Sequence, residues 1–295
     1  MDSLFFTLIL FSVLAYGLHG TLLTIFVRKI DSLNVTIYRN LSFIITMLPL
    51  LFFTTFDEIS KLADFLPELF FASSAAVVAL WTRLECIKHM PFGIATSIRQ
   101  GIQVVFAFFL GYFILGELFT FLEISIIFII LLAVVSISLM KMQTAHLENS
   151  NKVLGFILII IGGIFNTLAF FYFAILSREL NPFIATYFWE SVIGIIALSV
   201  ALIFGGKQGL PKIKILRPDD IIKISLVSTL TIIGTLGFAF ALRMGDFAIA
   251  SSLMVTVVVV QAILGYFFLK EKLNIRQILA ILLIVVAVMA LKLIS

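Results

Sequence analysis

Long apolar segments, each about the length of a membrane crossing, follow one another along nearly the whole chain of 295 residues. A helix needs roughly 20 apolar residues to cross about 30 Å of hydrocarbon. Ten segments meet this requirement, over residues 4–27, 34–55, 66–88, 91–115, 121–140, 153–177, 182–206, 219–242, 247–269 and 275–294. The pattern therefore predicts an all-α integral membrane protein with ten transmembrane helices.

A sequence motif recurs between the two halves of the chain. The segment GYFILGE at 111–117 is matched by GYFFLKE at 265–271, a shift of 154 positions. A polar stretch from Met142 to Lys152 separates the halves, so we expect one five-helix repeat over 1–148 and a second over 149–295. Because five is an odd number, two similar halves must lie in the membrane in opposite orientations. This inverted repeat is typical of secondary transporters.

Composition agrees with a lipid environment. Hydrophobic residues make up 62% of the chain and charged residues 12%, whereas about 25% of the residues of soluble domains are charged. The basic residues stand singly or in small groups between apolar runs, which does not indicate nucleic-acid binding. The single cysteine excludes an internal disulfide, and no Cys or His cluster has metal-ligand spacing. We therefore expect neither a cofactor nor a structural metal.

The links between the apolar segments differ in charge. The even-numbered links carry few basic residues beyond Lys61, Arg178 and Arg243. The odd-numbered links carry Arg28, Lys29, Lys88, Lys141, Lys152, Lys207, Lys212, Lys214, Arg217, Lys270, Lys272 and Arg276. Because cytoplasmic links are the basic ones, the charge pattern predicts that both termini lie outside.

Three features resemble the EamA-type, ten-helix branch of the drug/metabolite transporter superfamily. In each half a small-residue run opens the fourth helix, at 95–97 and 250–252, and the pairs Gly116-Glu117 and Lys270-Glu271 precede the fifth. Arg39 matches an arginine usual in the family's second helix. The resemblance covers essentially the whole chain and implies transport of amino acids, nucleotide conjugates, sugar phosphates or other metabolites by alternating access, without enzymatic chemistry. It also implies cytoplasmic termini, so the orientation stays open.

Ionisable residues inside apolar spans are costly and are functional candidates for that reason. Glu190 lies about nine residues into the seventh span, which places it roughly 12 Å deep at 1.5 Å per residue. It is the best candidate for a carboxylate that exchanges a proton or pairs with a cationic group of the substrate. The alternative is a structural partner for Arg39 or Arg99.

A second polar group lies in the fourth span. Arg99 and Gln103 share a helix face, and Gln100 is adjacent. A guanidinium group suits a carboxylate or phosphate, so we expect substrate contact here; an ion pair between Arg99 and Glu85 is the alternative.

Arg39 could guide anions inward or lock its helix. His19 falls opposite Asn166 when the halves are aligned, and we expect Arg83, near the end of its helix, to reach the headgroups. The remaining candidates for the wall of a binding pocket are Trp189, Tyr187, Met254 and Thr256.

These observations predict a multi-pass carrier in the cell's cytoplasmic (inner) membrane. We expect its cavity between the halves, lined by spans one to four and six to nine, with the fifth and tenth spans serving as packing or dimer helices. The expected partners are the lipid bilayer, a small-molecule substrate and a coupled proton or counter-substrate, in a monomer or homodimer.

An amino acid or related zwitterion is the first candidate substrate. Nucleotide-like solutes, including S-adenosylmethionine, and sugar phosphates come second, and drug efflux third. A channel or membrane sensor is the alternative to transport. No nucleophile–base or metal motif indicates an enzyme.

Overall fold

The computed structural model describes residues 3–27, 29–138, 151–206, 212–269 and 275–294. Over these residues all regular secondary structure is helical. Several positions used above lie outside the described residues, namely Arg28, Lys141, Met142, Lys207, Lys270, Glu271 and Lys272.

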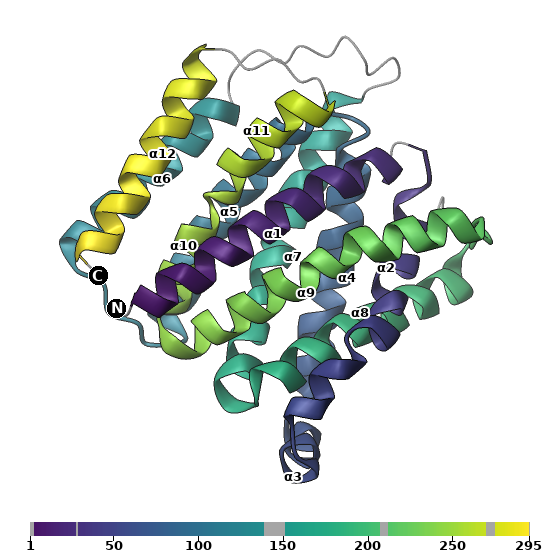
Figure 1. The fold of residues 1–295 in the computed structure, drawn as a ribbon. Coiled ribbons are helices and arrows are strands. Elements are labelled where there is room, and N and C mark those ends of the chain that lie inside the picture. The colour runs from purple at the N-terminus through teal and green to yellow at the C-terminus, as the bar shows by residue number, and fades with distance from the viewer. Residues whose placement is uncertain (1–2, 28, 139–150, 207–211, 270–274, 295) are drawn as a thin grey trace.

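Five principal helices form each half (Figure 1). In the first half they are α1 Ser3–Val27, α2 Ser32–Thr46, α4 Leu66–Cys86, α5 Phe92–Phe113 and α6 Phe121–Ser138. In the second half they are α7 Lys152–Glu179, α8 Pro182–Phe204, α9 Pro218–Met244, α10 Phe247–Met254 continued by α11 Val257–Leu269, and α12 Ile275–Ile294. Among the described residues, seven helical stretches are long and apolar enough to cross a membrane, and two further apolar helices are shorter.

The second helix is shorter than the segment predicted at 34–55. It ends at Thr46, and a 3-10 helix, η1 Leu48–Phe53, follows with Pro49 in its first turn. Proline lacks the N–H that would continue the α-helix, and its ring clashes with the preceding turn. The chain then reaches α4 through two short helices, α3 Phe56–Ser60 and η2 Lys61–Phe65. Figure 1 shows α3 at one end of the molecule.

The ninth span, predicted as one helix at 247–269, is broken in the middle. The N–H of Val255 bonds the carbonyl of Ser252, and that of Thr256 bonds Leu253, both three residues back. The first residues of α5 and α10, Phe92 and Phe247, are 155 positions apart, whereas the GYF segments are 154 apart. The second half is thus one residue shorter over this stretch, and the break lies within it.

The contacts between the halves occur in symmetry-related pairs. If the halves are superposed, α1 corresponds to α7, α2 to α8, α4 to α9 and α5 to α10–α11. The packing of α4 on α7 then corresponds to that of α1 on α9, and both are observed. The packing of α5 on α7 likewise matches that of α1 on α11. This pattern is that of a pseudo-two-fold axis between inverted repeats.

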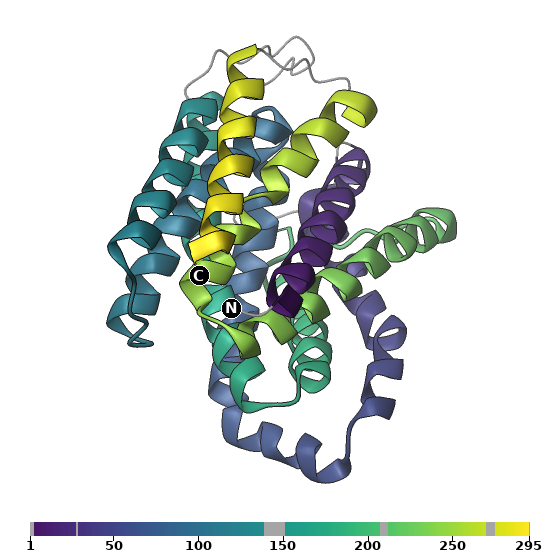
Figure 2. The same cartoon turned by 60° about the vertical axis from the view of Figure 1, so that its left-hand side comes forward.

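The helices α6 and α12 form a separate layer. Figures 1 and 2 show them side by side at one edge of the molecule. Ile130 and Ala133 of α6 share a buried cluster with Ile284 and Ala287 of α12. Many large apolar side chains elsewhere are exposed, among them Phe52 at 84%. An outer surface of this kind suits contact with lipid.

The helices α2 and α8 cross at close range. A Cβ atom on Gly194 would lie 2.8 Å from the backbone of Asn40 and Leu41. Cβ atoms in proteins do not approach other atoms this closely. Small residues at such crossings let membrane helices approach one another. This crossing brings Arg39 of α2 beside Glu190 of α8.

Candidate functional site

A polar cavity lies at the junction of the two halves. Its lining comes from α1, α2, α4 and α5 of the first half and from α7, α8, α10 and α11 of the second. Among the described residues, α6, α9 and α12 contribute nothing to the lining. The eighth span, α9, was expected to line the cavity, but it packs outside the lining helices. Eight predicted site residues line the cavity: Glu190, Arg99, Gln103, Arg39, Gln100, Asn166, Trp189 and Met254.

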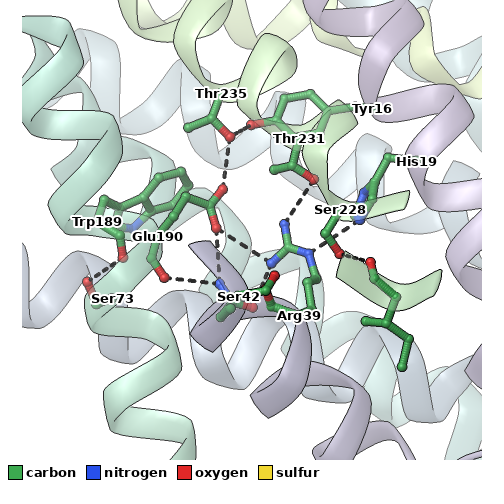
Figure 3. Close-up of polar contacts among 12 residues, drawn as sticks. Tyr16, His19, Arg39, Ser42, Ser73, Trp189, Glu190, Ser228, Thr231 and Thr235 are labelled. Atoms are coloured by element: carbon green, nitrogen blue, oxygen red, sulfur yellow. Dashed lines mark hydrogen bonds and ion pairs between the residues drawn. The ribbon is translucent and has the colours of Figure 1, made fainter. Parts of the chain in front are cut away.

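One side of the cavity is held by a buried ion pair. Nη1 of Arg39 lies 3.5 Å from Oε2 of Glu190, and the same nitrogen donates to Asn40 at 2.7 Å. Glu190 also accepts hydrogen bonds from Asn40 at 3.0 Å and from Thr235 of α9 at 2.9 Å. Figure 3 shows Arg39 between Glu190 and Thr231. This arrangement engages both oxygens of Glu190 and ties α2 to α8 and α9.

Two further side chains extend the network to α1. Thr235 has one hydroxyl proton and donates it to Glu190, so the hydroxyl of Tyr16, 2.7 Å away, is the donor to Thr235. Nε of Arg39 donates to Nε2 of His19 at 3.3 Å, so this ring nitrogen is an acceptor and carries no proton. His19 lies on the side of Arg39 away from Glu190 (Figure 3) and is not part of the cavity lining.

Arg99 has no hydrogen bond or ion pair within the described part of the chain, although its side chain is almost entirely buried. The alternative partner, Glu85, instead accepts from Ser32 and from Lys88 at 2.8 Å. Arg83, expected at the headgroups, also lines the cavity. The structure therefore places two arginines, Arg83 and Arg99, in the cavity lining without an acidic partner among the described residues.

Amide side chains also line the cavity. Asn166 of α7 donates to Oε1 of Gln103 at 2.9 Å. Gln100 donates at 3.4 Å to the carbonyl of Met254, at the point where the ninth span is broken. The break thus supplies a backbone carbonyl to a neighbouring helix, as broken helices do where they line a cavity. These bonds join the two halves through polar contacts.

Aromatic rings form another wall. Trp189 stacks on Phe173 with ring centroids 4.1 Å apart and lies 5.5 Å from Phe170. Its indole N–H is buried without a partner among the described residues. Two other predicted residues lie outside the lining: Tyr187 donates to the carbonyl of Ile44, and Thr256 bonds within the helix break.

Sequence reasoning did not single out Tyr16 and assigned Arg83 to the headgroups. A signal for Arg83 exists in the spacing of α4. Ala76, Ala79 and Arg83 share one helix face at intervals of three and four, and all three line the cavity. A small-residue stripe leading to an arginine therefore marked a helix face that turns inward. For Tyr16 we find no comparable signal.

A second ion pair joins the halves near the ends of α5 and α7. Arg178 donates to Glu117 at 3.0 Å, and Glu117 accepts from the backbone N–H groups of Phe247 and Ala248 at 2.6 and 3.0 Å. A carboxylate at a helix N-terminus is favourable because the helix dipole is positive there. Burial, with the nearby carboxylate of Glu117, raises the pKa of Asp246.

A protein-family model described as the EamA-like transporter family matches this chain twice, over residues 4–139 and 153–293. The chain belongs to this family. The predicted fold, an all-α membrane protein of two inverted five-helix repeats, and the predicted family are confirmed. As an EamA protein, the chain is a multi-pass membrane transporter and not an enzyme.

A solved structure agrees with the fold of this EamA protein. A chain described only as "Crystal structure of protein" is 13% identical with a TM-score of 0.68, and the alignment covers 99% of this chain and 97% of the other. At this identity the likeness shows the fold alone. No curated protein matches the sequence.

Proposed function

We propose that this EamA protein is a secondary transporter that moves a small ionised metabolite by alternating access between its two halves. The observation that carries the proposal is the cavity of charged and amide side chains at the junction of the inverted repeats. Arg99 and Glu190 are the eighth and ninth residues of α5 and α8. Each therefore lies roughly 12 Å from its helix end, at the depth typical of a transporter site.

An amino acid or related zwitterion is one candidate substrate. Its carboxylate would meet the guanidinium groups of Arg83 and Arg99, which are free of acidic partners among the described residues. Its ammonium group would lie against Trp189 and Phe170, because aromatic faces attract cations, with Glu190 at the same wall. Both poles of a zwitterion therefore have side chains of suitable chemistry.

A nucleotide-like solute or sugar phosphate is the second candidate. The specific observation in its favour is the coexistence of two arginines with the aromatic wall of Trp189 and Phe170. Arginine binds phosphate through two parallel hydrogen bonds, and an aromatic ring stacks on a base. The same cavity would then hold the two ends of one molecule.

We further propose that the protein works in the cell's cytoplasmic membrane, as a monomer or homodimer, and couples to a counter-substrate rather than a proton. Both carboxylate oxygens of Glu190 are engaged by Arg39, Asn40 and Thr235. These contacts place Glu190 in a structural ion pair, which supports coupling to a counter-substrate. The links richer in basic residues would face the cytoplasm.

Transport by the purified protein in liposomes tests the carrier. Liposomes loaded with an unlabelled metabolite should accumulate the same labelled metabolite by counterflow, and protein-free liposomes should not. The panel should contain amino acids, dicarboxylates, sugar phosphates and nucleotides. A steady ion current without counterflow of any member would contradict the carrier and favour a channel.

A further inference from the structure

The charges that line the central cavity do not balance. Over the part of the chain that the structure describes, the lining contains the arginines Arg39, Arg83 and Arg99 and one acid, Glu190. Arg39 and Glu190 form an ion pair and neutralise one another. Two positive charges remain, those of Arg83 and Arg99.

These two arginines line the same cavity and have no acidic partner among the described residues. Like charges that share one cavity repel one another. Arg99 is 6% exposed and its Nε is buried without a hydrogen-bond partner. Nη2 of Arg83 lies over Gly20, beside the amide of Gln261. Both arginines line the same cavity.

Two like charges in such a place are unfavourable unless an anion joins them. A charged side chain at membrane depth costs a few kcal/mol even after relaxation, and a buried charge requires a counter-charge. The remaining polar groups of the cavity are amides, a phenol and an indole, so none of them supplies that counter-charge.

We propose that the substrate carries two negative charges, as a dicarboxylate or a phosphate monoester does, and that Arg83 and Arg99 bind them. This inference rests on the proposed function and narrows its substrate. A guanidinium group offers a planar fork of donors that matches a carboxylate or phosphate. A neutral zwitterion would leave the cavity with two uncompensated charges, and a cationic drug would leave more.

The cavity also has acceptors for the rest of such a molecule. Oε1 of Gln100 and Oε1 of Gln261 are buried without a partner among the described residues, while each amide nitrogen is already bonded. These oxygens suit hydroxyl groups of the substrate. A hydroxylated dicarboxylate or a sugar phosphate would satisfy both the arginines and the amides.

Charge-matched probes test the proposal. The purified protein in liposomes would be assayed for counterflow with succinate, glycerol 3-phosphate and adenosine monophosphate, against succinamide, glycerol and adenosine as neutral counterparts and serine as a zwitterion. We expect at least one dianion to be exchanged at least tenfold faster than its neutral counterpart and than serine. Comparison of succinate with the two phosphate esters separates a carboxylate substrate from a phosphate one.

Variants connect the preference to the two arginines. Arg83→Gln and Arg99→Gln should each weaken counterflow of the preferred dianion about tenfold or more, and Arg83→Lys should lose less because it keeps the charge. Arg217→Gln, at an exposed ion pair, should leave counterflow unchanged. Thermal unfolding of each purified variant would show that it remains folded.

The outcomes separate the two proposals. Exchange of serine or of a neutral probe as fast as the dianions would overturn the dianion proposal and leave the carrier standing. If Arg83→Gln and Arg99→Gln both kept the wild-type preference for dianions, the dianion proposal would also be overturned and the carrier would stand. Absence of counterflow for every probe, and for the broader panel above, would contradict the carrier itself.

Discussion

At the residue scale, the pairing of Arg39 with Glu190 sets the character of the cavity. Both side chains lie at least 94% buried, and each has further hydrogen-bond partners. The low dielectric strengthens their attraction, but removal of either partner would leave a buried charge uncompensated. The pair therefore adds no net charge to the cavity, and the net positive charge of the described lining comes from Arg83 and Arg99.

Substitution of Glu190 by glutamine tests this pairing. Glu190→Gln should lower the free energy of unfolding by about 3 kcal/mol, because Arg39 keeps its charge and loses its partner. The Arg39→Gln, Glu190→Gln double variant should recover part of that loss. Thermal unfolding in detergent measures both.

Arg217→Gln is the matched control, since its ion pair with Asp220 is exposed on the arginine side and such pairs are worth about 1 kcal/mol or less. If Glu190→Gln unfolded at the wild-type temperature, the ion pair between Arg39 and Glu190 would not stabilise the fold.

Sequence reasoning found the buried ionisable residues but not their partners. Arg39, Arg99 and Glu190 stood out because charge is rare in apolar spans, and all three line the cavity. The sequence left open whether Glu190 meets the substrate or an arginine, because those residues are far apart in the chain. The position of Arg83 near the end of its helix predicts contact with the headgroups, whereas the structure places this residue in the cavity lining.

At the scale of helices, the α2–α8 crossing positions the site. Gly194 permits backbone contact there, because a side chain at this position would meet the backbone of Asn40 and Leu41 at 2.8 Å. Neither helix can give way by a change of rotamer. The distance between Arg39 and Glu190 depends on this approach.

Substitution of Gly194 by alanine should separate the two helices. We expect Gly194→Ala to lower the free energy of unfolding by about 1–3 kcal/mol through overpacking, and to slow counterflow because the ion pair is displaced. The neighbouring Ile195→Ala, at a half-exposed position, should change both properties little. Wild-type stability of Gly194→Ala would show that the crossing is not tight.

Glu117 joins the halves near the ends of α5 and α7. It accepts from Arg178 and from the first two N–H groups of α10. Glu117→Ala leaves the two backbone N–H groups without an acceptor, and Arg178 loses its carboxylate while keeping its bonds to the carbonyls of Leu242 and Gly245. We expect the free energy of unfolding to fall by about 2–4 kcal/mol, measured by thermal unfolding.

Glu179→Gln, at an exposed residue next to Arg178, is the control and should unfold like wild type. Equal stability of Glu117→Ala and the control would indicate that other contacts hold the α10 end.

At the scale of the whole molecule, alternating access requires the cavity to pass through an occluded state. With substrate bound, the charges of Arg83 and Arg99 would be compensated. Without it, both guanidinium groups would have to lose water while uncompensated, which is costly in a low-dielectric interior. The empty transporter should therefore reorient slowly.

This predicts exchange rather than net transport. Efflux of labelled substrate from liposomes should be at least tenfold faster with unlabelled substrate outside than without it. The Arg83→Gln, Arg99→Gln double variant should narrow this ratio, because its empty cavity is neutral. Equal efflux with and without external substrate in the wild type would contradict the prediction.

The sequence by itself determined the number of apolar segments, the two repeats and their opposite orientation. These follow from length, hydrophobicity and an odd helix count, which are properties of the chain in one dimension. The tertiary structure alone decided where α2 ends its α-helical course, where the ninth span breaks and which charges pair. Pairing depends on distances between helices that are remote in sequence. It distinguishes Glu190, which is paired with Arg39, from Arg83 and Arg99, which have no acidic partner in the described part of the chain.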